Sequence, residues 1–241
     1  MPKFTLPLAE RRGVAEGTVG FFFDLAGRSF TFIPGQSVSV VLPELRYQDE
    51  KGNRRTFSIA SSPADSHLLV ATRMTGSAFK RTLGEVPPGT VVTVTGPMGE
   101  FTLPEDAGPR VVLIAGGIGI TPFRSIIKDA TERKAPHGIT LFYANRTPED
   151  AAFLDEMEGW ARENPRIRFV PTMTKPHQSK RGWQGRTGYL DASMIREAVE
   201  DRDRATFYVA GPPAMVQGVL KILQEMGVGE DRTRVEEFSG Y

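Results

Sequence analysis

The sequence contains no cysteine and few histidines, three among 241 residues. The absence of cysteine excludes a disulfide framework, a cysteine nucleophile, a cysteine-bound zinc ion and an iron–sulfur cluster carried by this chain. His67, His137 and His177 are widely separated, and their spacing matches no metal-binding motif. We therefore expect surface or loop histidines and no metal site.

Excess charge of one sign and long apolar runs are also missing. Lysine and arginine number 30 against 29 acidic residues, a net charge of +1 that argues against a general grip on nucleic acid. No segment approaches the roughly 18 apolar residues of a membrane span, and the first residues lack a signal-peptide core. The sequence therefore predicts an ordinary cytoplasmic globular protein with no membrane span and no nucleic-acid partner.

The first hundred residues have the pattern of short strands separated by turn residues such as Pro34-Gly35 and Pro87-Pro88-Gly89. This pattern predicts a small antiparallel β-barrel with one short helical insert at residues 77–83. The candidate strands are residues 17–24, 30–33, 37–42, 55–60, 67–72 and 91–95.

After Gly108-Pro109 the pattern changes to alternating strands and helices. Such alternation implies right-handed βαβ units and a doubly wound parallel sheet. We therefore predict two domains, residues 1–106 and 107–241. The expected strands of the second domain are residues 110–115, 139–143, 167–172 and 206–210, and the expected helices are 122–133, 148–163, 192–200 and 213–226.

A glycine-rich turn follows the first strand of the second domain, where the chain reads GGIGITP from Gly116 to Pro122. Glycines let the backbone approach a phosphate, and a helix N-terminus offers free N–H groups and a positive dipole end. The spacing is not G-x-G-x-x-G, and the glycines alone leave open a turn that binds nothing.

A second turn, Gly211-Pro212-Pro213-Ala214-Met215, follows the strand at residues 206–210. The carboxyl ends of parallel strands face one crevice, where doubly wound sheets bind ligands. Two such turns at one edge favour a nucleotide site.

The first domain carries two further motifs, Arg55-Thr56-Phe57-Ser58 and Gly76-Ser77. Taken separately, they are most simply interpreted as a solvated arginine, a strand aromatic and a helix N-cap serine. Together with the two glycine turns and Glu236-Glu237-Phe238, however, they resemble the ordered motifs of the ferredoxin–NADP reductase superfamily. The resemblance extends over nearly the whole chain, although alanine stands at position 210, where the family often has cysteine.

The resemblance implies a flavin-binding barrel followed by an NAD(P)-binding α/β domain. It implies that Arg55 neutralises flavin phosphate, Phe57 packs on the isoalloxazine and Ser58 bonds near its N5. Phe238 would cover the flavin, or Tyr241 would do so. The implied catalytic residues are Ser58, Thr121, Glu236 and Phe238. The implied cofactor-binding residues are Arg55, Thr56, Phe57, Ser58, Gly76, Ser77, Gly116, Gly117, Gly119, Thr121, Pro122, Asn145, Arg146, Thr174, Lys175, Gly211, Pro212, Met215, Phe238 and Tyr241.

By this resemblance the protein would be an FAD-dependent NAD(P)H oxidoreductase that passes electrons to a separate ferredoxin, flavodoxin or oxygenase component. A free-flavin or quinone reductase is the alternative enzyme, and a flavin-binding electron-transfer subunit is the alternative outside catalysis. The basic stretch around Thr174-Lys175, with Lys180 and Arg181, favours NADPH over NADH, because a 2′-phosphate attracts cations. A solvated loop or a docking patch for an acidic ferredoxin explains the same charges.

Overall fold

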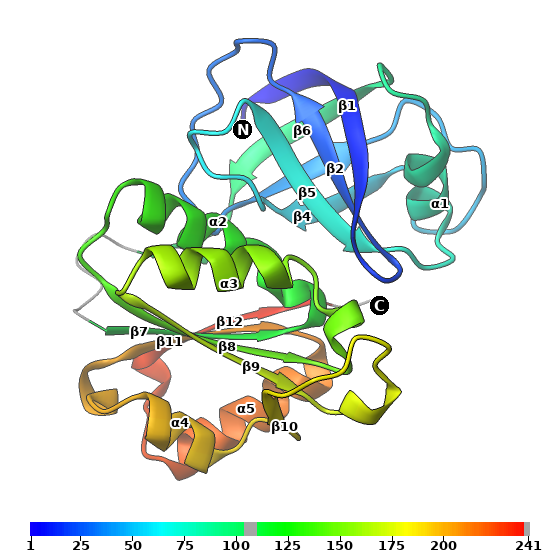
Figure 1. Cartoon of the computed structure of the whole chain (residues 1–241). Helices are drawn as coiled ribbons and strands as arrows, with labels where there is room; N and C mark the ends of the chain where they lie inside the picture. Colours follow the sequence, from blue (N-terminus) through cyan, green and yellow to red (C-terminus); the bar gives the residue numbers. More distant parts are fainter. Residues whose placement is uncertain (104–109, 239–241) are drawn as a thin grey trace.

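The computed structural model describes residues 1–103 and 110–238, which form two stacked domains (Figure 1). The first is a closed-up antiparallel sheet of order β4-β3-β6-β1-β2-β5, and the second is a parallel sheet of order β10-β9-β8-β7-β11-β12 with helices on both faces. The predicted fold class is confirmed. The predicted boundary at 106/107 falls among residues 104–109, outside the described residues.

Alternation along the strands of the first domain separates two apolar environments. Phe21 and Phe23 are fully buried inside the barrel, whereas Phe22 between them packs against the core of the second domain. The strands are β1 (Lys3–Ala15), β2 (Thr18–Asp24), β3 (Ser37–Val41), β4 (Arg54–Ser58), β5 (His67–Arg73) and β6 (Val91–Met98).

One strand of this domain was missed, and one predicted strand was wrong. The long strand β1 was not predicted, because its second half is exposed and charged and so lacks apolar alternation. Residues 30–33 form no strand; Phe30 and Phe32 instead insert their rings into the barrel core from an irregular segment. Helix α1 (Ala78–Glu85) begins where residue types predict, because the Ser77 hydroxyl accepts a hydrogen bond from the backbone N–H of Lys80 at 3.3 Å.

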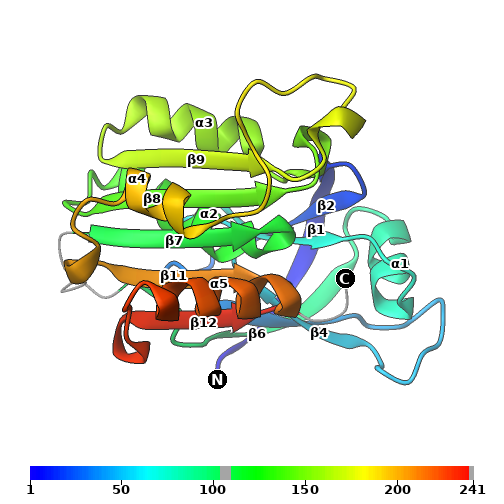
Figure 2. The same cartoon turned by 90° about the horizontal axis from the view of Figure 1, so that it is seen from below.

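In the second domain, helices α2 and α3 lie between the sheet and the first domain, and α4 and α5 cover the other face (Figures 1 and 2). The helices are α2 (Ile120–Glu132), α3 (Leu154–Glu163), α4 (Ala192–Ala198) and α5 (Pro213–Glu225). The strands are β7 (Arg110–Gly116), β8 (Gly138–Asn145), β9 (Ile167–Met173), β10 (Arg186–Thr187), β11 (Thr206–Gly211) and β12 (Thr233–Glu237).

The expected elements of this domain are present, with three differences. The helix predicted at 148–163 is interrupted, since Phe153 takes a left-handed conformation (φ 59°) and α3 begins after it. Helix α2 begins at Ile120, which leaves Pro122 in its first turn, where no donated N–H is needed. The edge strands β10 and β12 were not predicted, because their sequences are polar.

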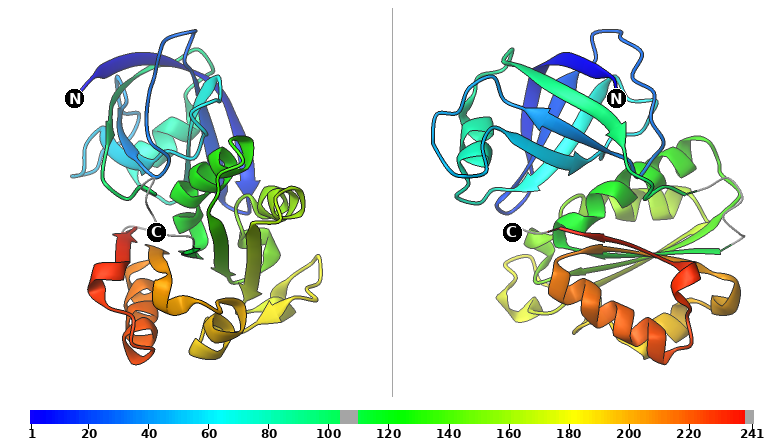
Figure 3. Two further views of the ribbon diagram at one scale, coloured as in Figure 1. Left: turned by 90° about the vertical axis from the view of Figure 1, so that its left-hand side faces the viewer. Right: turned by 180° about the vertical axis from the view of Figure 1, so that it is seen from behind.

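The two domains share one apolar core. The cluster between the second sheet and helices α2 and α3 continues into the barrel through Ala60, Leu69 and Ala71. Views from the side and from behind show α2 lying against the barrel (Figure 3). Within residues 1–103 and 110–238, no helix is long and apolar enough to cross a membrane.

Candidate functional site

A cavity of about 750 Å³ opens at the carboxyl ends of β7, β8, β9 and β11. This is the edge at which doubly wound sheets bind ligands. The predicted residues that line it are Gly116, Gly117, Asn145, Arg146, Thr174, Lys175, Pro212 and Met215. The structure therefore brings together, from four separate strand ends, most of the residues expected to bind the nicotinamide coenzyme.

Several lining residues were missed from the sequence, among them Arg73, Asp150 and Tyr189. Arg73 enters the cavity from β5 of the first domain and forms an ion pair with Asp150 at 2.6 Å. Tyr189, at the rim, exposes 81% of its surface. An aromatic residue directly after Gly188 could have marked a ligand-facing loop, but no sequence signal places Arg73 across the domain boundary.

Asn145 ends β8 and lies almost fully buried in the wall of the cavity. Among the described residues, neither its amide nitrogen nor its amide oxygen has a hydrogen-bond partner. Buried polar atoms without partners are costly, by roughly 1–3 kcal/mol each. A polar ligand in the cavity would satisfy both atoms, so this residue fits a coenzyme site.

The two glycine turns touch back to back. A Cβ atom at Gly119 would lie 2.2 Å from the carbonyl oxygen of Ala210, and one at Gly211 would lie 3.2 Å from Gly116. Gly119 and Gly211 therefore permit close packing, whereas Gly117, with φ +51°, turns the chain at the cavity itself.

Thr121 and Pro122 lie behind this turn and do not line the cavity. The Thr121 hydroxyl donates to the carbonyl of Ile118 at 3.0 Å and is buried. The catalytic and cofactor-binding roles implied for Thr121 stay predictions.

In the first domain, the N-terminus of α1 already holds an anionic group. One carboxylate oxygen of Asp49 accepts from the backbone N–H of Ala78 at 2.8 Å, and the other lies 3.4 Å from a guanidinium nitrogen of Arg55. The hydrogen bond from Ala78 is the main cause that holds the pKa of Asp49 below its usual value. Arg55 also donates to the carbonyl oxygens of Lys51, Gly52 and Arg54.

Positive charge exceeds negative charge around the N-terminus of α1, a region called the cradle below, which includes Lys51, Arg55 and Lys80. Lys80, in the first turn of α1, is almost fully buried, and its burial together with the nearby Arg55 and Lys51 lowers its pKa from 10.5 to about 8. The Asp49 carboxylate forms an ion pair with one of these cations, Arg55. Phosphate groups suit a helix N-terminus with adjacent cations, so the residues fit a phosphate-bearing cofactor. Gly76 and Ser77 lie directly before this helix.

The two domains meet at Ser58 and Glu236. The hydroxyl of Ser58, at the end of β4, donates to a carboxylate oxygen of Glu236 at 3.3 Å. Glu236 lies on β12 opposite Ala210, so the second glycine turn and this contact belong to one pair of strands. Burial raises the pKa of Glu236 from 4.5 to about 7, and the hydrogen bond from Ser58 opposes that rise.

The other residues predicted to bind flavin lie in three different surroundings. Phe57 is buried in the barrel core, with its ring centroid 5.9 Å from that of Phe79, while Thr56 is exposed on the outer side of β4. Phe238 packs against the core shared by the domains, and its N–H donates to Gly211 at 2.9 Å. Tyr241 lies outside the described residues.

Comparison with known proteins identifies the family. A family model described as an oxidoreductase NAD-binding domain matches residues 113–221. Ferredoxin–NADP reductase B of Sorangium cellulosum is 33% identical over 220 residues, which cover 88% of this chain and 87% of that protein. The chain belongs to the ferredoxin–NADP reductase superfamily.

Other proteins are similar to this chain over part of their length or in fold alone. One subunit of the Na(+)-translocating NADH-quinone reductase of Pseudomonas aeruginosa is 32% identical over 199 residues, 80% of this chain but 47% of that subunit. The chain thus spans about half the length of such relatives. The Amycolatopsis cytochrome P450 reductase GcoB superposes with a TM-score of 0.80 at 27% identity, covering 98% of this chain and 70% of that one. The FAD/NAD-binding domain of nitric oxide dioxygenase from Vibrio cholerae shows the same fold at 20% identity, with a TM-score of 0.82 over 97% and 98% of the chains.

Proposed function

We propose that the protein binds FAD, takes reducing equivalents from NADPH or NADH, and passes electrons to a separate protein such as a ferredoxin, a flavodoxin or an oxygenase component. One observation carries this proposal: the paired strands β11 and β12 connect the coenzyme cavity to the region of Ser58 and Arg55. Pro212, after β11, lines the coenzyme cavity, while Glu236 of β12 reaches Ser58 on the strand that carries Arg55. The two halves of a hydride-transfer site are thereby held side by side.

Each part of the site has a defined task in this proposal. Arg55, Lys80 and the N-terminus of α1 hold the phosphates of the flavin, which supplies the redox chemistry when bound. Glu236, with a pKa of about 7, holds or releases a proton through the Ser58 hydroxyl near neutral pH. No histidine is required.

The test is spectroscopic and kinetic. We expect the purified protein to be yellow, to release FAD on denaturation, and to be reduced under anaerobic conditions by one of the two coenzymes. Arg55→Ala should weaken FAD binding at least about tenfold while the protein stays folded, since a charge-assisted hydrogen bond contributes about 1.5–3 kcal/mol. If no flavin is released and none binds on reconstitution, the proposal is wrong; release of FMN changes the cofactor alone.

The acceptor is tested with a panel of ferredoxin, flavodoxin, free FMN, quinone and ferricyanide. Preference for free FMN or quinone would identify a reductase with a diffusing acceptor. The similarity to a subunit of the Na(+)-translocating NADH-quinone reductase supports a different candidate, an electron-transfer subunit of a larger complex. That candidate predicts that the isolated chain binds flavin but passes electrons to no acceptor of the panel.

For the coenzyme, the structure supports NADPH through paired strand ends. Backbone N–H groups of Thr174 and Lys175 donate to the carbonyls of Asn145 and Arg146, at 2.9 and 2.8 Å, which sets two cationic side chains together in the cavity wall. Lys175→Ala should lower the ratio of kcat/KM for NADPH to that for NADH about tenfold. Lys180→Ala, in the same loop but outside the cavity lining, is the control. Preference of the wild type for NADH, or an unchanged ratio in the Lys175 variant, would assign this loop to acceptor docking instead.

A further inference from the structure

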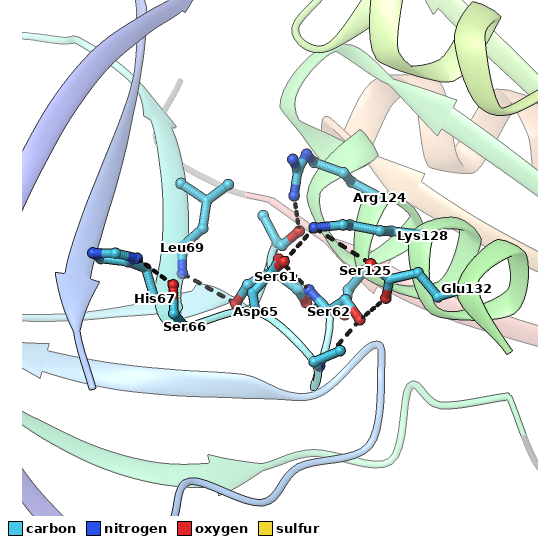
Figure 4. A network of polar contacts seen from close by, with 12 residues as sticks. Ser61, Ser62, Asp65, Ser66, His67, Leu69, Arg124, Ser125, Lys128 and Glu132 are labelled. Atoms are coloured by element: carbon cyan, nitrogen blue, oxygen red, sulfur yellow. Dashed lines mark hydrogen bonds and ion pairs between the residues drawn. The ribbon is translucent and has the colours of Figure 1, made fainter. Parts of the chain in front are cut away.

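A network of polar contacts joins helix α2 to the segment that follows β4 (Figure 4). Two neighbouring residues of α2 contact two neighbouring main-chain carbonyls. A guanidinium nitrogen of Arg124 donates to the carbonyl of Ala60 at 2.5 Å, and the Ser125 hydroxyl donates to the carbonyl of Ser61 at 2.6 Å. Because both acceptors are backbone atoms, the contacts fix the path of the main chain itself.

Arg124 is held rigidly on the side of the second domain. Its remaining nitrogens donate to one carboxylate oxygen of Glu156 at 3.0 and 2.6 Å, and the guanidinium stacks at 4.7 Å from the ring centroid of Phe153 and 5.4 Å from that of Trp160. The side chain is 9% exposed. A buried, doubly anchored guanidinium has little freedom, so a displacement of α2 must be transmitted to Ala60.

These contacts lie close along the chain to both parts of the proposed site. Arg124 follows the glycine turn of the coenzyme cavity by little more than one helical turn, since α2 begins at Ile120. Ala60 follows Ser58 by two residues, about 7 Å of extended chain. The link therefore couples the coenzyme turn to the flavin-side strand over a short path.

We propose that Arg124 and Ser125 are positioning residues, which fix the position of the coenzyme cavity relative to the strand that ends at Ser58. This inference rests on the proposed function. Hydride transfer requires reacting atoms about 3–3.5 Å apart, and a displacement of about 1 Å can lower its rate on the order of a hundredfold. Their effect is exerted through the backbone, so neither residue needs to touch a cofactor.

Other contacts at the same interface serve as internal controls. Farther along α2, Lys128 forms an ion pair with Asp65, and Glu132 accepts a hydrogen bond from the hydroxyl of Ser62. These contacts, with the shared apolar core, keep the domains together when Arg124 is replaced. They are more distant from the glycine turn and join side chains to side chains.

The experiment compares holoprotein variants by stopped-flow reduction, by the charge-transfer absorbance of the coenzyme–flavin complex, and by hydrogen exchange at residues 60–66. In Arg124→Met we expect the reduction rate to fall about 10- to 100-fold, with a weaker charge-transfer band and faster exchange. Dissociation constants for flavin and coenzyme should change less than about threefold. Ser125→Ala should show a smaller change of the same kind, and Arg124→Lys should recover part of the rate. Lys128→Gln should stay within about threefold of the wild type.

Three outcomes would overturn the inference. An unchanged reduction rate and charge-transfer band in Arg124→Met would show that other contacts fix the position of the cavity. An equal loss in Lys128→Gln would show that any loosening of the interface has the same effect. If Arg124→Met does not fold, Ser125→Ala and Arg124→Lys decide, and wild-type behaviour in both would refute the positioning role. A wild-type protein that binds flavin but is reduced by neither coenzyme refutes the proposed function itself, a result distinguishable from all three.

Discussion

Replacing Glu236 with glutamine should make the protein more stable at alkaline pH and leave its stability unchanged at acid pH. The carboxyl is half-buried between the domains, and this partial burial raises its pKa from 4.5 to about 7. Glutamine keeps an oxygen that can accept from Ser58, now at 3.3 Å from Glu236, but it cannot ionise. The substitution therefore removes the charge with little change in shape.

The sign and size of the effect follow from proton binding in the two states. Below pH 4.5 the folded and unfolded chains both hold the proton, and the group contributes no difference. Between pH 4.5 and 7 the unfolded chain loses the proton while the folded chain retains it, so the free energy of unfolding falls as pH rises. Above pH 7 the free energy of unfolding falls no further. Each tenfold change in proton affinity corresponds to about 1.4 kcal/mol, so the shift from 4.5 to about 7 lowers the free energy of unfolding by about 3 kcal/mol.

Urea unfolding of the apoprotein between pH 4 and 8 measures this difference. The free energies of unfolding of the wild type and Glu236→Gln should coincide at pH 4 and diverge, in favour of the variant, by up to about 3 kcal/mol at pH 8. Glu237→Gln is the matched control, because the neighbouring carboxylate is exposed and bonds only to Gln217 among the contacts described. A difference between wild type and Glu236→Gln that does not vary with pH, or the same divergence in Glu237→Gln, would refute the assignment of the raised pKa to this carboxyl.

Two further predictions concern the flavin cradle and the glycine turns. Asp49→Asn should tighten FAD binding about two- to fivefold and leave riboflavin binding unchanged, because a competing charge leaves the helix N-terminus; Glu50→Gln in the same loop is the control, and weaker binding of FAD would show that Asp49 instead organises the cradle. Gly119→Ala should destabilise the protein by about 2 kcal/mol or more in thermal or urea unfolding, because the added Cβ would lie 2.2 Å from the carbonyl oxygen of Ala210. Gly159→Ala on α3, with open space around it, should not destabilise, and equal stability of the two variants would contradict the packing argument.

The family and the fold class could be predicted from local patterns in the sequence. Buried parallel strands are continuous apolar runs, and the turns after them must be glycine-rich where a helix and a strand approach closely. Both signals are contained in segments of about a dozen residues. For the same reason, the residues of the cavity wall that follow β7, β8, β9 and β11 were predictable as strand ends.

The elements that the sequence left undetermined lack such a local signal. Strand β12 is polar and exposed, and it becomes a strand only because β11 offers it an unpaired edge. Phe30 and Phe32 are apolar, as in a strand, but the barrel core receives their rings without a sheet ladder. In each case pairing or packing with a distant segment decides the conformation.

The sequence alone predicted the segments on which each half of the candidate site is built: the N-terminus of α1 in one domain and the two glycine turns in the other. How the halves face each other was decided only by tertiary structure, through Arg124 on Ala60, Arg73 on Asp150 and Ser58 on Glu236. Each of these contacts joins residues more than 60 positions apart, and at the third of them burial raises the pKa of Glu236, which no neighbouring residue in the sequence could do. A short segment of sequence specifies what its side chains can bind, but the fold sets the distance and dielectric environment in which they do so.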